Sequence, residues 1–127
     1  MNVRSITCFV NAGPAGDGPQ NALQAAGRLA RQVHAALEAA GLPVQSRRLA
    51  TQPLSSLPGD LLALARDLAG QAAAAGFDYL SLGPVLAAGP GAGLERLALL
   101  PELIRAHDTT FAGVLVAGRG AGVNLAA

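Results

Sequence analysis

Short runs of β-branched and aromatic residues alternate along the chain with longer segments in which apolar residues recur every three or four positions. The short runs are typical of buried strands, and the longer segments are typical of helices with one apolar face. The pattern predicts strands over residues 3–10, 44–51, 77–82 and 110–117. It predicts helices between them, over residues 21–40, 61–75 and 94–106.

Several residues mark where these helices should begin and end. Asn21 with Gln24 three positions later resembles a capping box, and Asp60 is placed to cap the second helix. Gly76 should end that helix. Pro101 interrupts the third segment, so it should either kink the helix or start a second short one at its first turn.

The predicted order is β-α-β-α-β-α-β, which indicates an α/β fold. Each crossover is long enough to carry a helix, so parallel pairing with right-handed connections is the simplest topology. We expect a single domain over residues 1–127 with a mostly parallel sheet of four or five strands. The second strand is the least apolar, which indicates an exposed face or an edge position. Residues 123–127 are predicted as a strand or the start of a helix.

Composition narrows the class of protein. With 51% hydrophobic and 13% charged residues in 127, disorder is excluded. A net charge of +1 and 3% aromatic residues argue against a nucleic-acid partner. Apolar stretches are broken before the roughly 18 residues of a spanning helix, so no membrane association is expected. The single cysteine and the lack of a signal peptide lead us to expect a cytoplasmic location.

No motif assigns a reaction to the chain. Glycine-rich turns at residues 11–18, 89–93 and 118–122 match neither the Walker nor the dinucleotide-binding pattern, and the chain contains no lysine. His34 and His107 lack a second ligand at metal spacing and are predicted to lie at the surface. Cys8 stands in an apolar strand and is predicted to be a buried, inert thiol. We therefore expect no metal and no cofactor.

Two adjacent arginines in the second strand are unusual. Side chains alternate along a strand, so Arg47 and Arg48 should point to opposite faces of the sheet. The arginine that faces inward needs an anionic partner.

Several blocks of the sequence resemble a known family. The most specific are Leu49-Ala-Thr-Gln-Pro53 and Tyr79-Leu-Ser-Leu-Gly-Pro84. Together with shorter matches over nearly the whole chain, they resemble the N-terminal part of the domain-of-unknown-function family 711, also called uncharacterised protein family 0210. The resemblance implies an α/β barrel like that of pyruvate formate-lyase, of which this chain would be about one half, truncated or stand-alone. It implies no established reaction, and the chain lacks a glycyl-radical segment.

Two hypotheses about function remain open. In the first, the chain binds a small anionic metabolite at the carboxyl ends of its strands, where open α/β sheets place ligands. The residues that would line this site are Asn11, Arg48, Thr51, Ser81, Gly83 and Arg119. In the second, the chain is an assembly module that completes its sheet by self-association or with a partner chain. We expect a homo-oligomer rather than a functional monomer.

Overall fold

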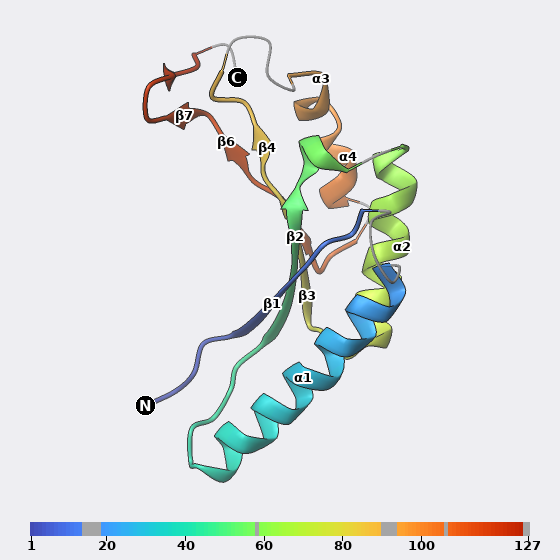
Figure 1. The fold of residues 1–127 in the computed structure, drawn as a ribbon, viewed down its shortest axis with the longest axis vertical. Helices are drawn as coiled ribbons and strands as arrows, with labels where there is room; N and C mark the ends of the chain where they lie inside the picture. The colour runs from blue at the N-terminus through green and yellow to red at the C-terminus, as the bar shows by residue number, and fades with distance from the viewer. Residues whose placement is uncertain (14–18, 58, 90–93, 106, 126–127) are drawn as a thin grey trace.

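A four-stranded parallel sheet forms the centre of the molecule (Figure 1). The computed structural model describes residues 1–13, 19–57, 59–89, 94–105 and 107–125. The strands lie in the order β1-β2-β3-β5. They are β1 (Ile6–Val10), β2 (Arg47–Pro53), β3 (Tyr79–Gly83) and β5 (Thr110–Phe111). The α/β class and the parallel sheet are confirmed, and the arrangement is consistent with half of an α/β barrel.

The helices lie against one face of this sheet. They are α1 (Pro19–Ala39), α2 (Leu61–Ala74), α3 (Leu94–Leu97) and α4 (Leu100–Arg105), with a 3₁₀ turn at Leu54–Ser56. Figure 1 shows α1, α2 and α4 on the same side of the strands. Among the described residues, no helix covers the opposite face. The sheet therefore has one face packed against helices and one uncovered face.

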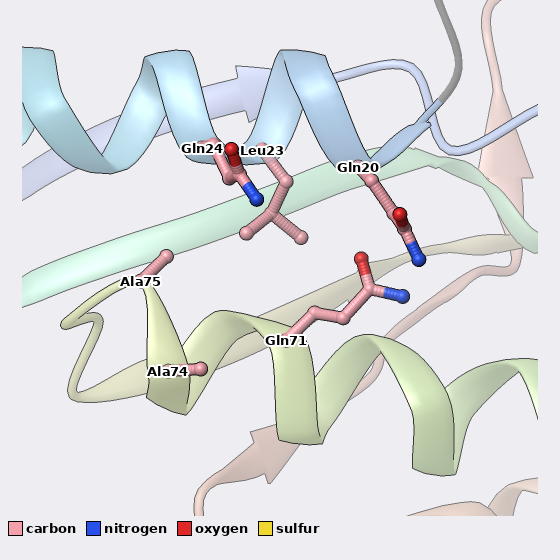
Figure 2. Close-up of a pocket in the computed structure, with 6 residues that line it drawn as sticks. All are labelled: Gln20, Leu23, Gln24, Gln71, Ala74 and Ala75. Carbon is pink, nitrogen blue, oxygen red and sulfur yellow. The ribbon is translucent and has the colours of Figure 1, made fainter.

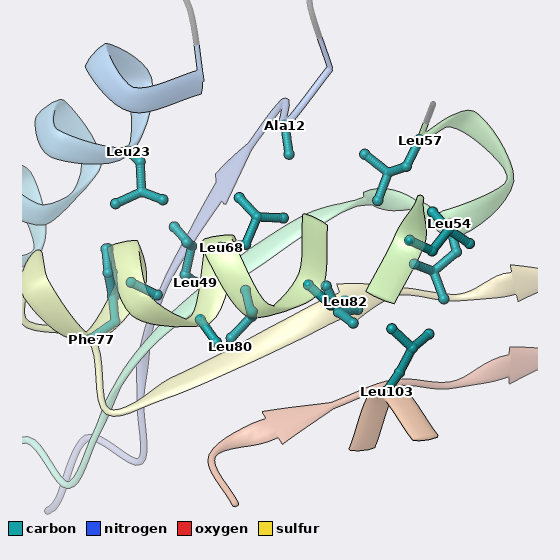
Figure 3. Packing of buried hydrophobic residues seen from close by; sticks show 14 of the residues in the cluster. Ala12, Leu23, Leu49, Leu54, Leu57, Leu68, Phe77, Leu80, Leu82 and Leu103 are labelled. Atoms are coloured by element: carbon teal, nitrogen blue, oxygen red, sulfur yellow. The ribbon is translucent and has the colours of Figure 1, made fainter. Parts of the chain in front are cut away.

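The hydrophobic core lies between the sheet and these helices (Figure 3). Leu49 of β2 and Leu80 of β3 meet Leu68 of α2, and Leu103 of α4 is fully buried at the far end. Leu23 brings α1 into the same cluster. Burial of one such side chain stabilises the fold by about 1.5–3 kcal/mol. The core thus holds the helices to one side and leaves the other side of the sheet without packing of this kind.

The ends of the helices agree only in part with the sequence prediction. Asp60 caps α2, because its Oδ1 accepts hydrogen bonds from the backbone N–H groups of Leu62 (2.9 Å) and Ala63 (3.2 Å). Pro101 lies in the first turn of a separate short helix, α4, which confirms the second of the two alternatives predicted for this proline.

The predicted capping box at the start of the first helix is wrong, since α1 already begins at Pro19 and Asn21 lies inside its first turn. Proline is favoured at the first position of a helix, where Pro19 stands, because an N–H at that position would have no acceptor within the helix.

The strand prediction needs two corrections. β2 is an interior strand with β1 and β3 beside it, so of the two alternatives the edge position is wrong, and β2 instead has one face on the uncovered side of the sheet. The predicted strand over residues 110–117 is divided into β5, β6 (Val114–Leu115) and β7 (Ala117–Gly118). Ala112 and Gly113 lie between β5 and β6, and the C=O of Gly113 accepts a hydrogen bond from Val85 N (2.9 Å).

The divided strand belongs to two small sheets beyond the main one. An unpredicted strand, β4 (Val85–Leu86), pairs in parallel with β6, and β8 (Gly122–Val123) pairs antiparallel with β7. Pro84 separates β3 from β4 because it has no N–H to continue the ladder. The C-terminal tail was predicted as a strand or the start of a helix, and its residues 123–125 contain only the end of β8. Residues 126–127 lie outside the described part of the chain. So do residues 14–18 and 90–93 of the glycine-rich turns.

Candidate functional site

The uncovered face of the sheet carries two rows of side chains. The strand register aligns Phe9 of β1, Ala50 of β2, Ser81 of β3 and Phe111 of β5 in one row. It aligns Thr7, Arg48 and Tyr79 in the row before it. Phe9 is 82% exposed and Phe111 is 52% exposed, at opposite edges of the sheet. We call these seven residues the open face.

Arg48 is anchored near the middle of the open face. Its guanidinium carbon lies 5.6 Å from the centre of the Tyr79 ring, and its Nε donates to Ser46 Oγ (3.3 Å). Tyr79 in turn contacts the Phe111 ring edge-on, with centroids 5.5 Å apart. Within the described part of the chain, neither ion pair involves Arg48. The side chain is therefore oriented by an aromatic ring and a hydroxyl, and no described carboxylate neutralises it.

Arg47 points to the other face and has the anionic partner that the sequence required. Its Nη2 lies 3.6 Å from Asp78 Oδ1, and its backbone N–H donates to Asp78 Oδ2 (2.7 Å). Both side chains are partly exposed, so this ion pair stabilises the fold by no more than about 1 kcal/mol. The expectation of opposite faces and an anionic partner for the inward arginine is confirmed.

At the carboxyl ends of β1 and β2, the amide side chains of Asn11 and Gln52 form a hydrogen-bonded pair. Asn11 Oδ1 accepts hydrogen bonds from Gln52 Nε2 (2.7 Å) and from Gly13 N (2.9 Å). Gln52 Oε1 accepts from Ala12 N (2.8 Å). Sequence reasoning missed Gln52, although its place beside Thr51 at the end of β2 could have indicated it. These hydrogen bonds hold the start of the loop after β1 against the end of β2.

Thr51 and Gly83 join β2 to β3 at the same end of the sheet. Thr51 Oγ1 accepts a hydrogen bond from Gly83 N (3.0 Å) and donates to the C=O of Gln52 (3.1 Å). A Cβ atom on Gly83 would lie 2.0 Å from that same carbonyl oxygen. Both residues are buried, so their polar groups are used inside the fold.

The six residues predicted to line a site thus fall into three groups. Asn11, Thr51 and Gly83 meet at the carboxyl ends of the strands, whereas Arg48 and Ser81 lie on the open face. Arg48 precedes Thr51 by three positions, which places it about 10 Å lower along the strand. Arg119 is exposed in the turn between β7 and β8 and makes no described contact with the others. Their role in binding a ligand stays a prediction.

Cys8 lies on the helix-covered face and is only partly buried, which corrects the prediction of a buried thiol. Its Sγ lies 3.7 Å from the carbonyl oxygen of Ala26 on α1. Loss of hydration raises the pKa of this thiol above its usual value. His34 was predicted to lie at the surface, but its side chain is partly buried. Its Nε2 lies 3.8 Å from Oε1 of Glu38, one helical turn later. In the described residues, no three His, Cys, Asp or Glu side chains gather as metal ligands would.

A hollow of about 260 Å³ lies in the helix layer, between α1 and the end of α2 (Figure 2). It is lined by Gln20, Leu23, Gln24, Gln71, Ala74 and Ala75. None of the six predicted site residues contributes to it. The described residues that line it carry amides and methyl groups and include no charged or nucleophilic side chain.

Comparison with known proteins places the chain in a family. The family described as Uncharacterised ACR (DUF711) matches residues 1–127, the full length of the sequence. No curated protein matches the chain. Over the described residues, no helix combines the length and the apolar character needed to span a membrane.

Proposed function

Because this chain belongs to the DUF711 family of uncharacterised proteins, we propose a function from its own surface. The open face binds a small molecule that carries an anionic group and an apolar body. The observation that carries the proposal is the state of Arg48. It is a cation oriented by Tyr79 and Ser46, and no described carboxylate pairs with it.

The anionic part follows from the chemistry of the guanidinium group. Arginine presents its donors in a planar fork that matches a carboxylate or a phosphate. The Nε of Arg48 is used by Ser46, which leaves the outer nitrogen atoms to face a ligand. A charged hydrogen bond of this kind contributes about 1.5–3 kcal/mol.

The apolar part follows from the neighbours of Arg48. Tyr79 and Phe111 form a continuous aromatic surface across β3 and β5, and Phe9 stands exposed on β1. Ser81 lies between Ala50 and Phe111 in the register and supplies the hydroxyl group in that row. A ligand with an aromatic or aliphatic body can lie on this surface while its anionic group reaches Arg48.

The proposal is tested with phenyl phosphate as the probe, followed by NMR titration of the chain. We expect saturable binding, weakened 10- to 100-fold or so in Arg48→Gln, as loss of one charged hydrogen bond requires. Arg28→Gln is the matched control, because Arg28 is exposed on α1 in the helix layer. Phosphate alone and phenol alone should each bind more weakly than phenyl phosphate. Equal affinity of the Arg48→Gln variant and the unmodified chain would refute the proposal.

A second candidate function is assembly, which the exposure of Phe9 and Phe111 favours. Soluble proteins seldom expose large apolar side chains in groups, and such groups commonly mark interfaces. In this function the open face is covered by another protein chain. Phe111→Ser should then lower the mass measured by light scattering from that of an oligomer to that of a monomer. A monomeric mass for the unmodified chain would exclude it.

A further inference from the structure

The outer edge of β1 carries backbone groups with no described partner. Ile6 N donates to the C=O of Ser46 (2.9 Å), the residue just before β2, so the backbone groups of Ile6 point into the sheet. The N–H and C=O groups of successive residues point to alternate sides of a strand. The backbone groups of Thr7 and Phe9 therefore point away from β2. Within the described part of the chain, neither residue makes a backbone hydrogen bond on that side.

This edge lacks the features that normally prevent strand pairing. Edge strands are usually protected by charged residues, proline, bulges or very short length. β1 reads Ile-Thr-Cys-Phe-Val over five residues and has none of these. The other edge strand, β5, is only two residues long. The main sheet is therefore open to pairing on the β1 side.

We propose that β1 pairs antiparallel with β1 of a second copy of this chain, around a two-fold axis at Cys8. Cys8 is the middle residue of β1, so this register gives the largest overlap of the two strands. It places Thr7 opposite Phe9 of the partner subunit, and both residues have outward N–H and C=O groups. Each such pair exchanges two hydrogen bonds, and the two-fold axis repeats the pair.

The second copy is favoured over an unrelated strand because the edge is self-complementary. The same two residues supply donors and acceptors on both sides, at positions equally distant from the centre of the strand. Pairing also places the exposed Phe9 ring beside Thr7 of the partner subunit on the open face, which removes part of the 82% exposure of the ring. The inference does not rest on the proposed ligand: it depends on the outward backbone groups of Thr7 and Phe9, whereas ligand binding depends on the Arg48 side chain, which the register aligns with Thr7.

The first test is the mass of the chain in solution by light scattering at high micromolar concentration. We expect twice 12.6 kDa for the unmodified chain and 12.6 kDa for Thr7→Pro. Proline at this position removes an outward N–H and leaves the β1–β2 ladder intact. Thr7→Val is the matched control, because it keeps the N–H and should remain dimeric. Circular dichroism shows whether each variant is folded.

The second test needs no change to the strand. In the proposed register, Cys8 faces Cys8 of the partner subunit with Cα atoms about 4.5 Å apart, which a disulfide can bridge. Mild oxidation should therefore give a covalent dimer. In Thr7→Cys with Cys8→Ser, the two introduced thiols lie diagonally at about 7–8 Å and should not cross-link. The inference is overturned by a monomeric mass, or by a dimer that survives Thr7→Pro but is lost in Phe111→Ser. A negative result in either of these tests would overturn the dimer but not the binding of phenyl phosphate, which is measured separately with the Arg48→Gln variant.

Discussion

Replacement of Gly83 by alanine should separate two strands of the main sheet. Gly83 ends β3, directly beside the backbone of Gln52 and Pro53 on β2. An added Cβ would lie 2.0 Å from Gln52 O, 2.3 Å from Gln52 C and 2.7 Å from Pro53 N. All three are backbone atoms, so no side-chain rotation can relieve the contact.

The expected cost follows from this geometry. Ordinary contacts of a Cβ atom begin near 3.4 Å, so the strands must move apart by more than 1 Å, roughly. Overpacking of this kind costs about 1–3 kcal/mol. The movement also breaks the buried hydrogen bond from Gly83 N to Thr51 Oγ1, which adds about 1–3 kcal/mol. We expect Gly83→Ala to lower the free energy of unfolding by about 3 kcal/mol, which lowers Tm by roughly 10 °C.

Urea unfolding followed by circular dichroism measures this change. Gly70→Ala is the matched control, because Gly70 lies exposed within α2 and an added Cβ meets nothing within 4 Å. That substitution should stabilise the chain by about 0.5–1 kcal/mol, as alanine does in helices. A Gly83→Ala variant within 1 kcal/mol or so of the unmodified chain would refute the close approach of β2 and β3.

Three further predictions concern the cap, the core and the thiol. Asp60→Ala removes the cap of α2 and should cost about 1 kcal/mol in urea unfolding; no change would mean that the two cap hydrogen bonds do not stabilise the helix. Leu103→Ala leaves a cavity at a fully buried position that joins α4 to the sheet, and thermal unfolding should show a loss of about 2–5 kcal/mol. The raised pKa of Cys8 lowers its thiolate fraction near pH 8, so a thiol reagent should label it more slowly than it labels the chain in urea; equal rates would contradict its desolvation.

Local patterns in the sequence predicted the elements whose stability is local. Asp60 was identified as a cap because the hydrogen bonds of a cap span only two or three residues. The division of the strand after Phe111 was missed because an apolar run of Ala, Gly, Val and Leu does not show where its pairing partner changes. That change depends on Pro84, which lies far away in the sequence and stops the neighbouring strand.

The candidate site was predicted least well where contacts join distant segments. Arg47 and Arg48 were recognised as pointing to opposite faces, whereas the low apolar content of the strand left an edge position open as one of two alternatives. The partners of these two arginines could not be read from local sequence, since Asp78 lies 31 residues from Arg47 and Tyr79 belongs to the adjacent strand. Gln52 was missed for the same reason, because its contact with Asn11 spans 41 positions. Alternation along a strand predicts which face a side chain occupies but not its partner.

We propose that the open face of the sheet is the functional surface of this protein. Mapping of NMR chemical-shift changes during titration with phenyl phosphate tests it most directly. We expect the largest changes on Thr7, Arg48, Tyr79 and Ser81, and we expect them to saturate together. Changes concentrated instead around Gln20, Gln24 and Gln71, in the hollow between α1 and α2, would contradict it.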